Sequence, residues 1–152
     1  MINVTDDDER FMRYAIAEAR KALEEDEIPI GAVVVSRGMV IGRGHNMTEQ
    51  LQDVTAHAEM QAITAAAQRL GGKYLENCTI YVTVEPCTMC AGAIGWSQIK
   101  RVVYGTGDSK RGYTTVTGPS SPFHPKATVT QGILQDECAS LMRMFFASKR
   151  SR

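Results

Sequence analysis

Residues 79–94 read TIYVTVEPCTMCAGAI, and this stretch decides the fold class. Its first six residues are all β-branched or aromatic, which predicts a strand over residues 79–84. Pro86 ends that pattern. It suits the first position of a helix, because its missing N–H would be unpaired there anyway. We therefore expect a strand that is followed at once by a helix over residues 87–96.

The segments on either side alternate between strand and helix patterns. We expect helices over residues 7–25, 56–70 and 133–148, and strands over residues 32–36, 39–44, 101–105 and 127–131. Thr5 or an early aspartate can cap the first helix, and Thr55 the second. Residues 106–126 have no clear period and predict a long loop. This alternation predicts a sheet with helices on both faces, in a single domain spanning residues 1–152.

Charge and cysteine content narrow the class of protein. Lysine plus arginine equals aspartate plus glutamate at 17 each, so the net charge of zero argues against broad electrostatic binding to nucleic acid and leaves room for a local basic patch. The acidic start MINVTDDDER predicts no signal peptide, and no apolar run approaches the ~20 residues of a membrane span. Four cysteines do not suggest a disulfide framework here, so a reducing cytoplasm fits best.

Two short motifs together predict a metal centre. Cys87 and Cys90 are three residues apart at the start of a helix, which places both sulfurs on one side, and the positive helix end favours thiolates. His57 and Glu59 are two residues apart, so they can reach one point only beyond the end of their helix. We infer a zinc ion between two helix N-termini, held by His57, Cys87 and Cys90. Glu59 would then lie near an open coordination position, an arrangement typical of hydrolysis by a metal-activated water.

These motifs have other interpretations. A Cys-x-x-Cys pair after a strand can be a redox pair instead of a metal grip. A closed structural zinc site needs a fourth ligand, and the remaining sulfur and imidazole candidates are Cys78, Cys138, His45 and His124. The two cysteines are better explained as core residues and the two histidines as ordinary polar residues of loops. Glu85 reads as a solvated residue before a proline and is given no chemical role.

The pattern His-x-Glu followed by Pro-Cys-x-x-Cys resembles that of the zinc-dependent cytidine/deoxycytidylate deaminase superfamily. Within it, the chain is similar over most of its length to the bacterial tRNA-specific adenosine deaminases. The similar stretches are IPIGAVVV, GRGHN, TAHAEMQAI, CTIYVTVEPCTMCAGAI, RVVYG and GILQDECASLM. The zinc motif identifies the superfamily, and the other stretches narrow the resemblance to this branch.

The resemblance implies a cytidine-deaminase-like, three-layer α/β/α fold around a five-stranded mixed sheet. It implies one zinc per chain on His57, Cys87 and Cys90, with Glu59 as the proton shuttle. It also implies a homodimer with active sites close to the subunit interface. The activity implied is the zinc-dependent hydrolytic deamination of adenosine to inosine at the wobble position of a tRNA anticodon loop.

The resemblance also implies substrate contacts. The asparagine matching Asn46 hydrogen-bonds the base, and residues matching Ile28, Asp108 and Lys110 lie near the anticodon loop. The chain departs from the family after Lys110, where the usual Gly-Ala-x-Gly-Ser is replaced by RGYTTVTG at residues 111–118. That segment would help to shape the substrate mouth, so the substrate is less strongly implied than the chemistry.

The C-terminal residues allow two interpretations. In one, Phe145 is a core residue and the basic tail SKRSR is a frayed end. In the other, Phe146, Lys149 and Arg150 form an RNA-contacting edge through aromatic stacking and phosphate contacts. Sequence context does not separate the two.

Two alternative functions remain open at this point. The first is deamination of a free base or nucleoside, of the cytosine or guanine type, because the same zinc chemistry serves both kinds of substrate. The second is a non-catalytic zinc-binding module that recognises RNA or a protein. In such a module a protein ligand would close the metal site, and Glu59 would have no purpose beside it.

Overall fold

The computed structural model describes residues 6–150. The helices are α1 (Asp6–Glu24), α2 (Thr48–Leu51), α3 (Ala58–Leu70), α4 (Thr88–Trp96), α5 (Tyr113–Thr117) and α6 (Gln135–Arg150). The strands are β1 (Gly31–Ser36), β2 (Met39–His45), β3 (Cys78–Val84), β4 (Arg101–Thr106) and β5 (Thr128–Gln131).

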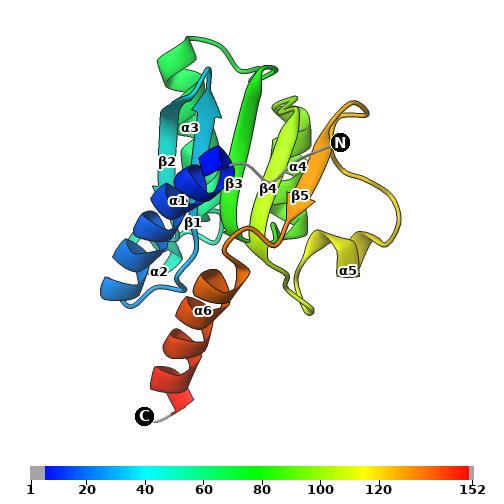
Figure 1. Cartoon of the computed structure of the whole chain (residues 1–152). Coiled ribbons are helices and arrows are strands. Elements are labelled where there is room, and N and C mark those ends of the chain that lie inside the picture. Colours follow the sequence, from blue (N-terminus) through cyan, green and yellow to red (C-terminus); the bar gives the residue numbers. More distant parts are fainter. Residues whose placement is uncertain (1–5, 151–152) are drawn as a thin grey trace.

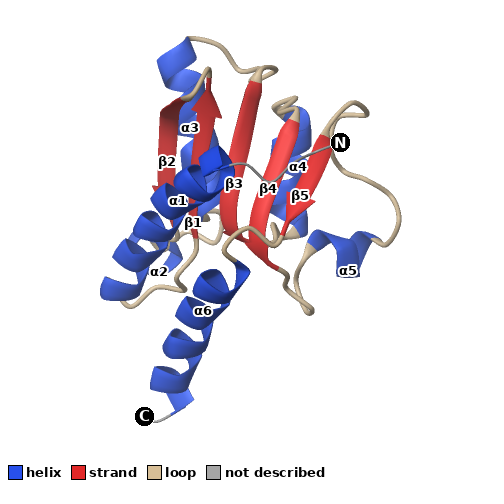
Figure 2. Ribbon diagram, viewed as in Figure 1, coloured by secondary structure: helices blue, strands red, loops and turns tan. Residues whose placement is uncertain are grey.

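The five strands form one mixed sheet in the order β2-β1-β3-β4-β5. β1 pairs antiparallel with both β2 and β3, whereas β3 with β4 and β4 with β5 are parallel pairs. Figure 2 shows α1 and α6 on one side of this sheet and α3 and α4 on the other. The expected three-layer arrangement around a five-stranded mixed sheet is therefore confirmed.

Each face of the sheet carries its own hydrophobic core, and β1 contributes to both. Ala32 and Val34 pack with α3 and α4, whereas Val33 and Val35 pack with α1 and α6. This alternation follows from the period of two along a strand, and because β1 is buried on both faces all four residues are apolar. The predicted apolar stripe of the first helix is confirmed by α1, which buries Phe11, Met12, Ala15, Ile16 and Ala19.

Helix α3 lies unusually close to β2, and a glycine permits this. A Cβ on Gly44 would overlap the carbonyl oxygen of Ala58 in the first turn of α3. The absence of a side chain at Gly44 thus lets the first turn of α3, and His57 before it, lie directly against the sheet.

A buried ion pair joins α1 to the middle of the sheet. The Asp8 carboxylate accepts hydrogen bonds from both terminal nitrogens of Arg101 at 2.6 and 2.8 Å, and from the Tyr81 hydroxyl at 2.8 Å. Asp8 is only 1% exposed. This bidentate geometry compensates the carboxylate for its loss of water.

The expected elements are present with shifted ends, and three local expectations were wrong. The predicted loop 106–126 contains the short helix α5, and residues 48–51, where no helix or strand was expected, form α2. Thr55 does not cap α3, because its hydroxyl donates instead to Asp53 Oδ1 at 2.7 Å. Thr5 lies outside the described residues. No helix within residues 6–150 has both the length and the apolarity that a membrane span requires.

Candidate active site

The ends of four strands meet at one edge of the sheet. Gly31 at the start of β1 pairs with His45 at the end of β2, and Val84 at the end of β3 pairs with Thr106 at the end of β4. Because Ala32 of β1 pairs with Val82 of β3, the Gly31–His45 pair and the Val84–Thr106 pair lie at the same edge, where these strand ends meet. The segments that follow these strand ends carry most of the candidate residues, as expected for ligand sites in open α/β sheets. Helix α6 extends past this edge (Figure 1).

Three candidate metal ligands converge at this edge. His57 Nδ1 lies 3.6 Å from Cys87 Sγ and 3.5 Å from Cys90 Sγ. These three donor atoms all lie within 4.8 Å of one another, and no other histidine, cysteine or acidic residue within residues 6–150 joins the group. One imidazole nitrogen and two sulfurs at this separation suit a tetrahedral zinc ion with three protein ligands.

Two of the three candidate ligands each lie immediately before a helix. His57 is the N-cap of α3 and Cys87 is the N-cap of α4, and both have extended backbones. Neither side chain makes a capping hydrogen bond, so both are directed elsewhere. The structure therefore places the three ligands between two helix N-termini, where thiolates are favoured.

The two sulfurs differ in acidity. The hydrogen bond with Cys90 lowers the pKa of Cys87 from 9.0 to about 4, and the hydrogen bond with His57 acts in the same direction. The same contact raises the pKa of Cys90. Cys87 is thus the first sulfur to ionise, and a coordinating metal ion deprotonates a bound thiol outright.

Glu59 lies in the first turn of α3, beside the ligands. It is 4% exposed, and burial raises the pKa of its carboxyl from 4.5 to about 7. It lines the same pocket as His57 and Cys87. A carboxyl group with a pKa near the operating pH can both accept and return a proton, which suits general acid–base chemistry.

The other sulfur and imidazole residues lie elsewhere. Cys138 is 1% exposed and Cys78 is 3% exposed, so both are core residues as expected. His124 lies in the loop before β5, where its Nδ1 accepts a hydrogen bond from the backbone N–H of Lys126. His45 was expected in a loop, but it is the last residue of β2. A fourth protein ligand from this set is therefore excluded.

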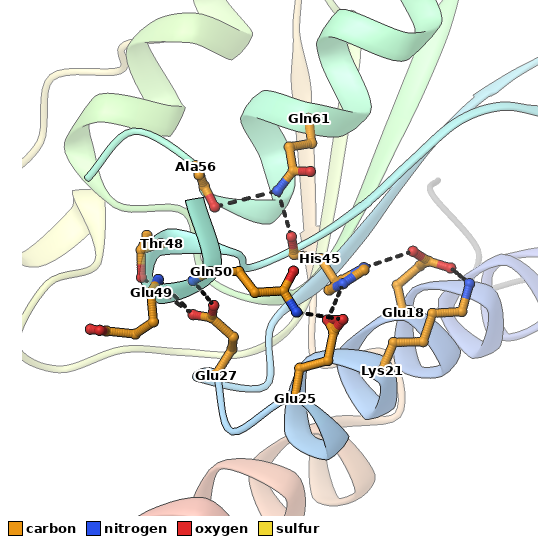
Figure 3. A network of polar contacts seen from close by, with 10 residues as sticks. All are labelled: Glu18, Lys21, Glu25, Glu27, His45, Thr48, Glu49, Gln50, Ala56 and Gln61. Atoms are coloured by element: carbon orange, nitrogen blue, oxygen red, sulfur yellow. Dashed lines mark hydrogen bonds and ion pairs between the residues drawn. The ribbon is translucent and has the colours of Figure 1, made fainter. Parts of the chain in front are cut away.

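Figure 3 shows the polar network around His45. Its Nε2 lies 2.6 Å from Glu25 Oε1, and its Nδ1 lies 3.4 Å from Glu18 Oε1. Its backbone carbonyl accepts a hydrogen bond of 2.6 Å from Gln61 Nε2 on α3. The end of β2 is thus tied to both α1 and α3, which fixes the position of Asn46 directly after it.

Glu27 anchors the neighbouring segment. This carboxylate is 1% exposed and accepts hydrogen bonds from the backbone N–H groups of Glu49 at 3.1 Å and Gln50 at 2.8 Å (Figure 3). It therefore satisfies donors at the start of α2 that the helix itself cannot pair. Because Ile28 follows Glu27 directly, the same contacts hold Ile28 at the pocket.

Five of the seven predicted substrate residues line one cleft: Ile28, Asp108, Lys110, Phe146 and Arg150. Ile28 and Asp108 also line the pocket that contains Glu59, so the cleft adjoins the candidate metal site. Residues from three distant parts of the chain are thereby brought together at the same edge of the sheet.

Asn46 and Lys149 lie differently. Asn46 is 5% exposed and is absent from the residues that line the pocket, although its backbone N–H donates to the Ile30 carbonyl at 3.1 Å. Lys149 pairs with Asp26 Oδ2 at 2.8 Å and does not line the cleft. Phe145 is a buried core residue, whereas Phe146 is 42% exposed.

Glu85 was expected to be solvated, and this expectation was wrong. It is 7% exposed and lines the pocket next to Cys87. Its carboxylate accepts hydrogen bonds from residues 23 and 29 positions further along the chain. An acidic residue that ends an apolar strand next to a ligand pair was the signal that could have marked it.

These features define a class. The chain belongs to the family of the cytidine and deoxycytidylate deaminase zinc-binding region, whose model matches residues 5–106. The matched region contains all three candidate ligands and Glu59, and it identifies the chain as a deaminase.

Individual relatives narrow the comparison further. The chain is 47% identical over 143 residues to a tRNA-specific adenosine deaminase of Agrobacterium fabrum, covering 92% of this chain and 94% of that one. It is 40% identical over 158 residues to a chloroplastic tRNA(adenine(34)) deaminase of Arabidopsis thaliana, covering 91% of this chain but 12% of that protein. A structure solved in work on A-to-I editing by tRNA:A34 deaminases superimposes with a TM-score of 0.80 at 44% identity, covering 87% of this chain and 98% of that chain.

Proposed function

We propose that this protein deaminates adenosine to inosine at the wobble position of a tRNA anticodon loop. The observation that carries the proposal is the convergence of His57, Cys87 and Cys90 beside the buried Glu59. The identity of 47% to a tRNA-specific adenosine deaminase supports this substrate over a free base. The same identity and the buried acid–base group argue against a non-catalytic module.

In this proposal His57, Cys87 and Cys90 hold one zinc ion per chain. Zinc, when bound, supplies a water that ionises near neutral pH. Glu59 would accept one proton of that water and deliver it to the ring nitrogen next to the amino-bearing carbon C6, to which the water oxygen becomes bonded. It would then carry the second proton of the same water to the amine, whose bond to C6 breaks. Water and adenosine are consumed, and inosine and ammonia are released.

The cleft beside the pocket is suited to RNA. Lys110 and Arg150 supply positive charge for phosphates, and Phe146 offers an exposed aromatic face on which a base can stack. Ile28 and Asp108 lie where the cleft meets the pocket. Asn46 is buried and does not line the pocket, so the proposal that it hydrogen-bonds the base rests on the family resemblance. An unpaired anticodon loop makes it inexpensive to splay one adenosine into the pocket.

We further propose a single-domain chain that acts as a homodimer in the cytoplasm. The dimer rests on the family resemblance, and Trp96 and Val54, 85% and 83% exposed, supply apolar surface that a second subunit can cover. Four free cysteines fit a reducing compartment. Light scattering during size-exclusion chromatography measures the mass directly, and a particle of 16.7 kDa would contradict the dimer.

Nucleoside mass spectrometry tests the activity. The zinc-loaded protein is incubated with an adenosine-34 anticodon stem-loop and, separately, with free cytosine, guanine and adenosine. We expect inosine in the stem-loop and no product from the free compounds. The Glu59→Ala variant is the control, because it should keep its zinc and lose nearly all turnover. Conversion of free bases without inosine in the RNA would overturn the proposal.

A further inference from the structure

A single buried carboxylate fastens the segment that forms one wall of the cleft. Glu85 Oε1 accepts a hydrogen bond of 3.1 Å from the backbone N–H of Asp108. Glu85 Oε2 accepts two hydrogen bonds from Thr114, at 2.9 Å from its backbone N–H and 2.6 Å from its hydroxyl. Since Asp108 and Thr114 are six residues apart, one side chain closes the segment 108–114 at both ends.

The closed segment is organised from within by Asp108. Its Oδ1 accepts hydrogen bonds of 3.0 Å from the backbone N–H groups of both Lys110 and Arg111, and its carbonyl accepts one of 3.0 Å from Gly112. Asp108 and Arg111 line both the cleft and the pocket with Glu59, and Lys110 lines the cleft. Three of the side chains that line the cleft therefore belong to the segment that Glu85 closes.

The Glu85 carboxylate and this segment are in close contact. A Cβ on Gly112 would overlap the Glu85 carboxylate, so the backbone rests directly on it. One further contact, an isolated antiparallel β-bridge between Gly112 and Cys87, ties the segment to the residues that follow β3. Its hydrogen bonds include the one of 3.0 Å that Tyr113 N–H donates to the Pro86 carbonyl. The position of the segment is thus set relative to a metal ligand.

We propose that Glu85 is a positioning residue. It holds segment 108–114 in the conformation in which Asp108, Lys110 and Arg111 contact the RNA next to the reacting adenosine. The inference rests on the proposed function and adds a residue to it that touches neither the base nor the metal.

Three variants test the role. Glu85→Gln keeps the size of the side chain, but its amide nitrogen is a donor and cannot accept from both ends of the segment. Thr114→Val removes only the hydroxyl donor at an exposed position, and Thr114→Ser restores it. All three are compared with the wild type in zinc content, in amide hydrogen exchange and in steady-state deamination of the anticodon stem-loop.

We expect Glu85→Gln to accelerate exchange in peptides covering residues 108–114 while peptides of α3 and α4 stay protected. The loss of one hydrogen bond to a charged group predicts a KM for the stem-loop raised about tenfold, with zinc content unchanged and kcat changed less than KM. Thr114→Val should accelerate exchange in residues 108–114 and raise the KM by smaller factors, and Thr114→Ser should match the wild type in both.

The outcomes separate the two proposals. A wild type that forms no inosine in the stem-loop contradicts the proposed function and with it this inference. A wild type that forms inosine, with variants that exchange faster but keep its KM, contradicts only the positioning role. A Glu85→Gln variant whose segment 108–114 exchanges as slowly as that of the wild type also overturns it, because the carboxylate then does not hold the segment.

Discussion

Replacing Glu59 with glutamine separates the electrostatic cost of this carboxyl group from its role in catalysis. Burial raises the pKa of Glu59 from 4.5 to about 7, so the unfolded chain loses this proton first as the pH rises. The contribution of this pKa difference to the free energy of unfolding is fully present below pH 4.5 and is lost as the pH rises through about 7. The difference between the two pKa values corresponds to about 3 kcal/mol in the free energy of unfolding. Glutamine cannot ionise, so the Glu59→Gln variant does not lose this stability as the pH rises.

The measurement is urea denaturation followed by circular dichroism, in the presence of a chelator and between pH 5 and pH 8. Glu59→Gln should be close to the wild type at pH 5 and more stable by up to about 3 kcal/mol at pH 8. With zinc restored, the variant should bind as much metal as the wild type and lose about 10² to 10⁴ in kcat. A stability difference that is constant with pH, or that favours the wild type at pH 8, would refute the reasoning.

Three further outcomes are expected. His57→Ala removes one of three ligands, so its zinc content by plasma mass spectrometry should fall well below that of the wild type; equal contents would contradict the ligand assignment. Gly112→Ala forces the new methyl group against the Glu85 carboxylate and should lower the free energy of unfolding by about 1 to 3 kcal/mol and raise the KM for the stem-loop. Asp8→Ala leaves the Arg101 guanidinium without its buried partner and should cost about 2 to 3 kcal/mol in urea denaturation, which an exposed Asp7→Ala variant should not.

The sequence was sufficient for those parts of the fold whose signals are local. Period-four apolar residues marked α1, and the run of β-branched and aromatic residues at 79–84, followed by Pro86, marked β3 and the start of α4. The spacing of Cys87 and Cys90 and the position of His57 were enough to predict that they would meet, because both motifs begin a helix. Side-chain periodicity and helix termini are properties of short segments and need no tertiary information.

The missed features depend on contacts between distant residues. Helix α5 consists largely of threonine and valine, which are poor helix formers, and Tyr113 is held instead by packing on Phe123 at a ring distance of 4.9 Å. Thr55 met the requirements of an N-cap, but Asp53 competes for its hydroxyl. Glu85 has its partners more than twenty residues away, and nothing in its own neighbourhood reveals them.

The attachment of segment 108–114, which forms one wall of the cleft, affects how the substrate preference of this deaminase can evolve. The groups proposed to break the C–N bond lie at the starts of α3 and α4, whose packing against the sheet also maintains the core. Segment 108–114 is held at both ends by the Glu85 side chain, and residues 109–111 between those ends are exposed to solvent. Substitutions at residues 109–118 can change which RNA binds in the cleft without disturbing the groups proposed to break the C–N bond. New substrate preferences are therefore expected to arise most readily from substitutions in this segment.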